Sequence, residues 1–236
     1  MSGQQFGRRR WLLATGGLGA GLLAVSRSSL AAKGEEDEGV TANEDLMREH
    51  GVIRRALLVF GEAARRARSD PGSVPLPSLG ETARLFREFA EDYHEHALEE
   101  VHIFPAVRKT KGPAARLPDI LLAQHRRGRE ITDYIRRISA GSALSAADAG
   151  PLANSLEGFV RMYEPHAARE DTELFPAWKA ALGRKAYAEM GERFEEIERK
   201  TFGHDGFEDA LKRIARIEST LGLADLAAAT APPPPR

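Results

Sequence analysis

The segment DYHEHALEEVHIFPAV, residues 92–107, combines three histidines with two adjacent acids and a Phe-Pro-Ala sequence. A second segment, PHAAREDTELFPAW at residues 165–178, repeats the order of histidine, acid pair and aliphatic-Phe-Pro-Ala. Apolar residues around both segments recur at helical rather than strand spacing. The repeat therefore predicts a helical fold in which two similar halves carry the same set of chemical groups.

Each half also has a lone histidine on an earlier helical segment. His50 lies in REHGVIRR, residues 48–55, and His125 lies in AQHRRGRE, residues 123–130. The chain is therefore predicted to form two helical hairpins. Each hairpin supplies one histidine from its first helix and a histidine with an acid pair from its second, so that the side chains converge at the axis of a bundle.

Helical periodicity continues through almost the whole chain between its two ends, and Gly- and Pro-containing segments interrupt it. No stretch shows the sustained alternation that is typical of strands. We predict an all-α fold, an antiparallel four-helix bundle with two extra C-terminal helices. The expected helices span residues 43–69, 79–109, 118–140, 146–182, 184–200 and 206–221.

Two registers are open for the ligands of the second helix. His96 lies four residues before Glu100 and three before Glu99, so these side chains share one face of a straight α-helix. His94 lies five residues before Glu99, and the two side chains share a face only if the helix contains a local bulge. Spacing on a straight helix favours His96.

On the later helix, His166 and Glu170 are four residues apart and share a face, whereas Asp171 lies about 140° further round the helix. Imidazole and carboxylate groups suit iron, manganese or zinc, and a carboxylate can bridge two metals. A buried histidine or glutamate is costly unless it is paired or metal-bound.

We expect His102 and His204 to be structural. The apolar residues expected to point inward around the site are Leu58, Phe60, Phe86, Phe89, Ile103, Phe104, Leu121, Leu122, Ile131, Phe159, Leu174 and Phe175.

Composition narrows the chemistry further. The chain has 236 residues, 34 Lys and Arg against 35 Asp and Glu, and no cysteine. The lack of cysteine excludes disulfides, cysteine-ligated metal and thiol catalysis. A net charge of −1 argues against a nucleic-acid partner.

The two ends of the chain are expected to lie outside the folded domain. In residues 1–31, Arg8, Arg9 and Arg10 precede the uncharged run WLLATGGLGAGLLAV, the layout of an export signal. The arginines resemble a twin-arginine signal, the alternative being an ordinary secretory signal. We expect export to the periplasm without stable membrane insertion after cleavage. Residues 32–42 are predicted to be a flexible acidic spacer, 43–223 the bundle, and 224–236 a disordered Pro-rich tail.

Several spaced segments together resemble the hemerythrin-like, or HHE cation-binding, domain. These are EH at residues 49–50, the two repeated segments above, and LLAQHRRGREI at residues 121–131. The resemblance covers about residues 42–227. It implies a four-helix bundle around two non-haem irons, with terminal histidine ligands, two bridging carboxylates and an open position for dioxygen or a related small molecule.

The sequence departs from the family pattern at two positions. Oxygen-binding hemerythrins have His-x-x-x-His on the third helix, but Arg129 follows His125 here. The position four residues before the first acid of the second helix is usually histidine, and here it is Glu95. The resemblance favours His94 with Glu99, with His96 and Glu100 as the second choice. The internal repeat favours Glu170 over Asp171, because Glu170 lies four residues before Leu174 as Glu99 lies four residues before Ile103.

The metal ligands predicted in this way are His50, His94, Glu99, His125, His166 and Glu170, with His96, Glu100 and Asp171 as alternatives. We expect two non-haem irons, with manganese or zinc as other candidates. The function favoured is the binding of dioxygen, peroxide or nitric oxide for sensing, storage or detoxification. The alternatives are a peroxidase-type di-iron oxidoreductase and a metal-free or zinc-bearing interaction module. A redox partner is not identified by the sequence.

Overall fold

The computed structural model describes residues 40–235, and within that range the fold is entirely helical, as the periodicity predicts. The predicted export signal and most of the spacer lie outside the described residues. The elements are α1 Ala42–Ser69, η1 Pro71–Ser73, α2 Leu76–Leu85, η2 Phe86–Ile103, α3 Phe104–Arg108, η3 Pro113–Arg116, α4 Leu117–Ser139, α5 Ala146–Arg169, η4 Glu170–Leu174, α6 Phe175–Phe202 and α7 Gly206–Leu221.

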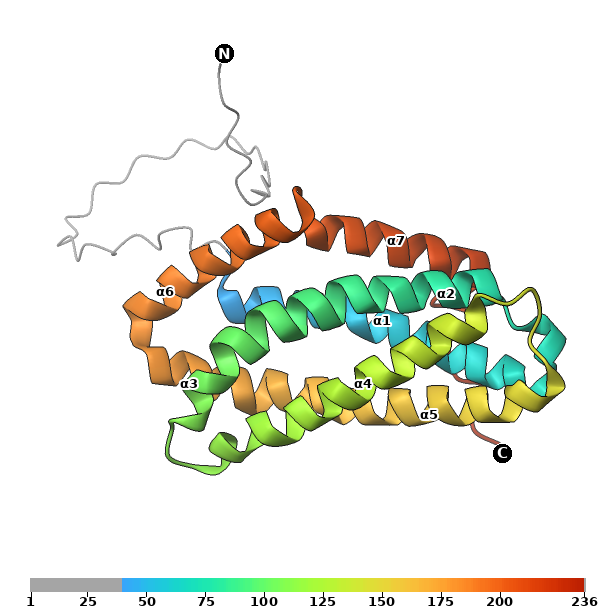
Figure 1. Cartoon of the computed structure of the whole chain (residues 1–236), viewed down its shortest axis with the longest axis horizontal. Helices are drawn as coiled ribbons and strands as arrows, with labels where there is room; N and C mark the ends of the chain where they lie inside the picture. Colours follow the sequence, from blue (N-terminus) through green and yellow to red (C-terminus); the bar gives the residue numbers. More distant parts are fainter. Residues whose placement is uncertain (1–39, 236) are drawn as a thin grey trace, which may run out of the picture. The chain divides into compact units, whose positions relative to one another are not determined.

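Four long helical segments lie side by side around one apolar core (Figure 1). They are α1, the continuous run of α2, η2 and α3, then α4, and the run of α5, η4 and the start of α6. α1 packs along α5, α2 packs along α4, and η2 contacts both α1 and α4. This arrangement brings the middle of each long segment toward the others.

Glycines end the C-terminal helices where the sequence places them. Gly203 and Gly222 adopt left-handed backbone angles, with φ of 72° and 75°, directly after α6 and α7. Glycine adopts this conformation without the steric cost that a Cβ brings. Asp205 caps the start of α7, because its carboxylate accepts a hydrogen bond from the Glu208 amide at 2.8 Å.

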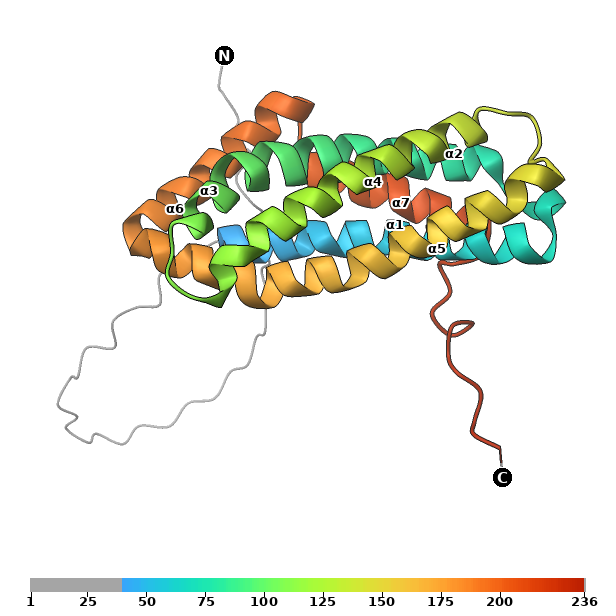
Figure 2. The same cartoon turned by 60° about the horizontal axis from the view of Figure 1, so that its bottom comes forward.

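One predicted break is confirmed and one predicted orientation is wrong. Gly183 has non-helical angles, φ 73° and ψ 169°, so α6 consists of two helices that meet at a kink where the sequence predicts one to end and the next to begin. Beyond the kink the chain turns back, and α7 packs on α1 and α2 (Figure 2). Leu58 was expected to point inward but is 61% exposed, since it lies on the outer face of α1.

The segments η2 and η4 are π-helices, and each ends at a Phe-Pro pair. The amide of Phe104 donates to the carbonyl of Glu99, and the amide of Phe175 donates to that of Glu170, both five residues back. The proline that follows each phenylalanine has no N–H with which to continue an α-helical pattern. A wider turn is therefore tolerated immediately before it, in both copies of the repeat.

Candidate metal centre

Six buried side chains from five helical elements converge inside the helical assembly. All six are at most 4% exposed. The π-helical turn of η2 places His94 and Glu99, five residues apart, on the same face, so this pair faces the cluster and His96 does not. The six residues are His50 from α1, His94 and Glu99 from η2, His125 from α4, His166 from α5 and Glu170 from η4.

The histidines form two facing pairs. The Nε2 atoms of His50 and His94 are 3.0 Å apart, and those of His125 and His166 are 3.2 Å apart. Unprotonated Nε2 atoms at these distances repel each other unless a proton or a metal cation lies between or beside them. The two pairs therefore mark two positions where positive charge is required.

Glu170 lies between the two pairs and turns one carboxylate oxygen toward each. Its Oε1 is 3.0 Å from Nε2 of His166, and its Oε2 is 3.4 Å from Nε2 of His50. Glu99 is placed in the same way, with Oε1 3.6 Å from Nε2 of His94 and Oε2 3.5 Å from Nε2 of His125. Each carboxylate thus has the geometry of a bridge between the two positions.

The four oxygens of Glu99 and Glu170 have no hydrogen-bond partner among the described residues. Both side chains are fully buried, and a buried carboxylate is costly unless a positive charge balances it. Four bare oxygens facing four imidazole nitrogens fit a pair of bridged metal ions. The residues present therefore fit the binding of metal cations at this cluster.

The outer nitrogen of each histidine is held by a separate acceptor. This contact fixes the ring so that Nδ1 carries the proton and Nε2 faces the centre, as is common for metal-binding histidines. The four Nδ1 contacts are His50 with Asp171 at 2.7 Å, His94 with Glu49 at 2.6 Å, His125 with Glu100 at 2.9 Å and His166 with Gln124 at 2.8 Å.

The acid pairs of the repeat therefore divide into two roles. The first acid of each pair, Glu99 or Glu170, faces the centre, while the second acid accepts from a histidine of the other half. Arg129 supports Glu100 at 2.7 Å, and Arg54 pairs with Asp171. Arg54 lies four residues after His50, and Arg129 lies four residues after His125. At the position where a His-x-x-x-His motif would have its second histidine, each half therefore has an arginine that contacts the second acid of the other half.

The ionisable groups of the centre have pKa values displaced from their ordinary ranges. Burial and the neighbouring charge of Glu170 raise the pKa of Glu99. Burial alone would lower the pKa of His94, but the carboxylates of Glu99 and Glu49 outweigh it and raise that pKa well above its ordinary value. For His125, burial is likewise outweighed by Glu95 and Glu100, which raise the pKa to about 9.

Phenylalanines of the two repeats cover the histidines of the first helices. Phe175 stacks on His50 with ring centroids 5.5 Å apart, and Phe104 stacks on His125 at 5.3 Å. Both phenylalanines are fully buried. The Phe-Pro pairs thus shape the π-helical turns and also form apolar walls against the centre.

Some histidines lie outside the cluster. The side chain of His96 is 64% exposed and contacts Glu100 at 3.1 Å, so it does not face the centre. His102 is half-buried beside Phe194, and His204 is exposed. The turn of η2 directs His94 inward and His96 outward.

Sequence reasoning missed Glu49 and Gln124, which accept from His94 and His166. The available signal was their position, since each directly precedes the first-helix histidine of its half, in the pairs Glu49-His50 and Gln124-His125. A second buried polar group lies beside the centre. Tyr163 donates to Glu95 at 2.7 Å, and its hydroxyl packs where Gly128 has no side chain.

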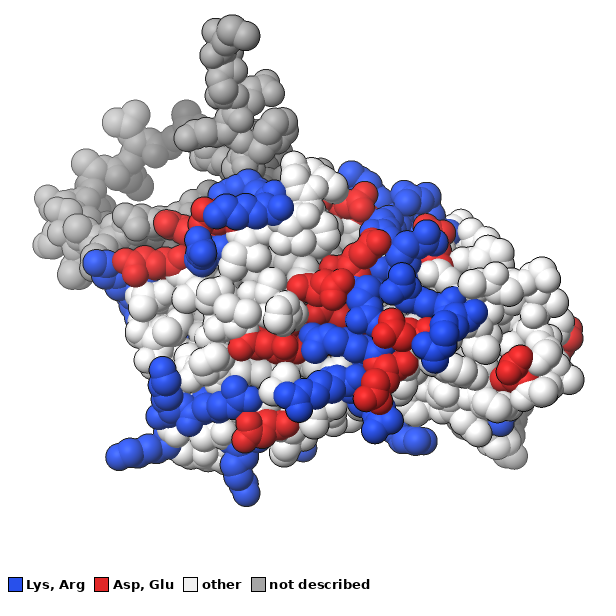
Figure 3. Space-filling model, in the orientation of Figure 1, with Lys and Arg blue, Asp and Glu red and all other residues white. Residues whose placement is uncertain are grey.

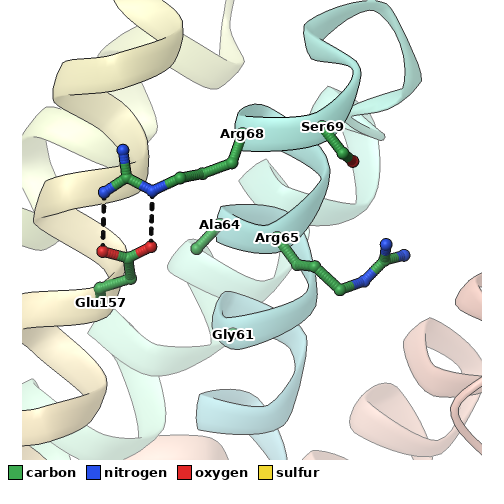
Figure 4. Close-up of a pocket in the computed structure, with 6 residues that line it drawn as sticks. All are labelled: Gly61, Ala64, Arg65, Arg68, Ser69 and Glu157. Atoms are coloured by element: carbon green, nitrogen blue, oxygen red, sulfur yellow. Dashed lines mark hydrogen bonds and ion pairs between the residues drawn. The ribbon is translucent and has the colours of Figure 1, made fainter.

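A surface recess of about 490 Å³ lies between α1 and α5 (Figure 4). Arg68 crosses it and forms a two-point ion pair with Glu157, at 2.8 and 2.9 Å. Gly61 at its edge lies eleven residues beyond His50, about 16 Å along the helix axis. The recess contains none of the six central residues and is separate from the metal centre.

The outer surface carries charges of both signs. On the face drawn in Figure 3, lysine and arginine side chains are interspersed with aspartate and glutamate. Among the described residues, no helix has the length and apolar character needed to cross a membrane.

Comparisons with known proteins agree with this geometry. Residues 41–178 match the family described as the Hemerythrin HHE cation binding domain. Uncharacterized proteins of Mycobacterium bovis and of two strains of Mycobacterium tuberculosis are each 40% identical over 232 residues, which cover 92% of this chain and 89% of the relative. No solved structure matches. With the buried histidine and glutamate cluster at its centre, the chain belongs to the hemerythrin HHE cation-binding domain family.

Proposed function

We propose that this chain is a non-haem di-iron protein that binds dioxygen, peroxide or nitric oxide for sensing, storage or detoxification. The observation that carries the proposal is the set of four partnerless oxygens on Glu99 and Glu170, each facing a histidine nitrogen. The antiparallel four-helix bundle of the family is the framework that we propose for it.

One metal would be held by His50 and His94, the other by His125 and His166, and both would share Glu99 and Glu170. Each metal then has four protein donors. Zinc is commonly satisfied by four donors, whereas iron accepts more and keeps positions open for a small ligand. Iron would supply a Lewis acid and electrons to that ligand.

The protein side chains would prepare this site for a small ligand. Glu49, Asp171 and Glu100 hold the imidazole rings in place, and Phe104 and Phe175 exclude water from two sides. Arg129 occupies the place of a further family histidine but contacts Glu100 and Glu95. It donates no nitrogen to the centre, which supports an open coordination position on that side.

The test is metal analysis of protein purified without added metal, with absorption spectra recorded in air and after reduction. We expect two irons per chain and a visible charge-transfer band. His94→Ala should lose iron, while the matched control His96→Ala, two residues away and exposed, should keep it. Zinc alone, or no metal, would refute the proposal, and rapid peroxide turnover would favour the oxidoreductase alternative.

We also propose export by the twin-arginine route. It is supported by Arg8, Arg9 and Arg10 before the apolar run, and by the advantage of exporting a protein that already contains its metals. Replacing the three arginines by lysine should leave the precursor in the cytoplasm. Normal export of this variant, measured by cell fractionation, would contradict the proposal.

A further inference from the structure

The metal centre has an approximate two-fold relation between its halves. Six side chains around one histidine pair have counterparts of the same chemical class around the other. The counterparts are His50 and His125, His94 and His166, Glu99 and Glu170, Asp171 and Glu100, Arg54 and Arg129, and Phe175 and Phe104.

Among the groups that hold the four histidines, one pair breaks this relation. Glu49 accepts from Nδ1 of His94 at 2.6 Å, whereas Gln124 accepts from Nδ1 of His166 at 2.8 Å. A carboxylate acceptor makes the opposite ring nitrogen a stronger metal donor than a neutral amide does, and it adds a negative charge near the cation. Both effects favour stronger metal binding at the His50 and His94 position.

Other charged groups do not remove this difference in metal affinity between the two histidine pairs. The other oxygen of Glu49 accepts only from the neutral hydroxyl of Tyr93, at 3.0 Å. On the opposite side, Glu95 lies 3.8 Å from Nδ1 of His125, outside hydrogen-bond distance. Its oxygens are contacted by Tyr163 at 2.7 Å and Arg129 at 3.3 Å, so its charge is partly neutralised.

We propose that the centre loads its two metals in a fixed order, first at His50 and His94 and second at His125 and His166. This inference rests on the proposed function, because it requires two metal positions. It means that the chain holds a single metal when the supply is limited, and that Glu49 and Gln124 are positioning residues that set the order.

The test is an anaerobic titration of the metal-free full chain with Fe(II), followed by calorimetry. We expect two steps whose dissociation constants differ about 10- to 100-fold, the range typical of changes in groups that hold metal-binding histidines. His50→Ala should remove the tight step, and His166→Ala should remove the weak one. ⁵⁷Fe Mössbauer spectra at one equivalent should show one dominant iron environment.

The decisive variant is the reciprocal exchange Glu49→Gln with Gln124→Glu, which keeps the net charge and both hydrogen-bond acceptors. It should invert the order, so that His166→Ala now removes the tight step. Gln124→Glu alone should tighten the second step, while the control Ala123→Glu, which adds the same charge at an exposed neighbouring position, should not.

Two equal steps in the wild type, or an order unchanged by the exchange, would overturn the inference and leave the di-iron proposal standing. Binding of fewer than two metals by the wild type would overturn both. Two ordered steps that invert on the exchange would support the inference.

Discussion

Replacing Glu99 by glutamine should have opposite effects on the metal-free and the metal-loaded protein. In the metal-free chain both oxygens of Glu99 are buried without a hydrogen-bond partner, close to the charge of Glu170. The amide removes the charge and can donate to Nε2 of His94 or His125, which lie 3.6 and 3.5 Å from the present oxygens.

An unsatisfied buried polar group costs about 1–3 kcal/mol. The Glu99→Gln chain without metal should therefore unfold at a higher temperature than the wild type, by about 2–4 °C for each kcal/mol in a domain of this size. The metal-loaded wild type should gain about 4 kcal/mol per site when free metal is 1,000-fold above its dissociation constant. The variant should lose most of this gain, because one amide oxygen cannot bridge two metals.

The assay is scanning calorimetry with a chelator and with anaerobic Fe(II), together with iron analysis. The control is Glu130→Gln, since the side chain of Glu130 on α4 is 63% exposed. It should change neither curve. A Glu99→Gln chain that is less stable than the wild type without metal, yet keeps the full metal-dependent gain, would refute the reasoning about the bare carboxylates.

Three further predictions follow from other parts of the structure. His125→Ala should lower iron from two toward one or none per chain by metal analysis, while His102→Ala should keep two. Burial and the charge of Glu95 raise the pKa of Glu91 to about 8, so the native state keeps a proton that the unfolded chain loses near pH 4.5. Stability should therefore fall between about pH 4.5 and 8, by at most about 1.4 kcal/mol per pH unit, and Glu91→Gln should flatten the pH dependence of melting. Gly128→Ala should cost about 1–3 kcal/mol in denaturant unfolding, since the new Cβ would lie 2.1 Å from the Tyr163 hydroxyl, and adding Tyr163→Phe should recover part of the loss.

The helical architecture could be predicted because its signals are local. The apolar periodicity predicted the long helices. Gly203 and Gly222 marked the C-terminal ends of α6 and α7 to within a residue or two. Leu58 was wrongly predicted to point inward. When the apolar stripe of a helix is wide, the sequence does not define which edge of that stripe packs against the neighbouring helices.

The centre was predictable only in part, since spacing on a straight helix favoured His96. The π-helical turn that brings His94 to Glu99 depends on the hydrogen bonds around Pro105, and the sequence showed the need for a bulge but not its position. The contact between His50 and Asp171 joins residues 121 apart and depends on how α1 packs against η4. No local pattern contains that information.

The exchange of acids between the halves bears on the origin of the chain. Asp171 of the second hairpin holds His50 of the first, and Glu100 of the first holds His125 of the second. Reciprocal contacts of this kind are the hallmark of an isologous dimer, in which the same surface patch meets itself across a two-fold axis. The fold has the form of two duplicated hairpins fused into one chain. A cut in the segment between α3 and α4, which joins the two hairpins, should therefore give fragments that bind no metal pair separately but restore the centre when mixed.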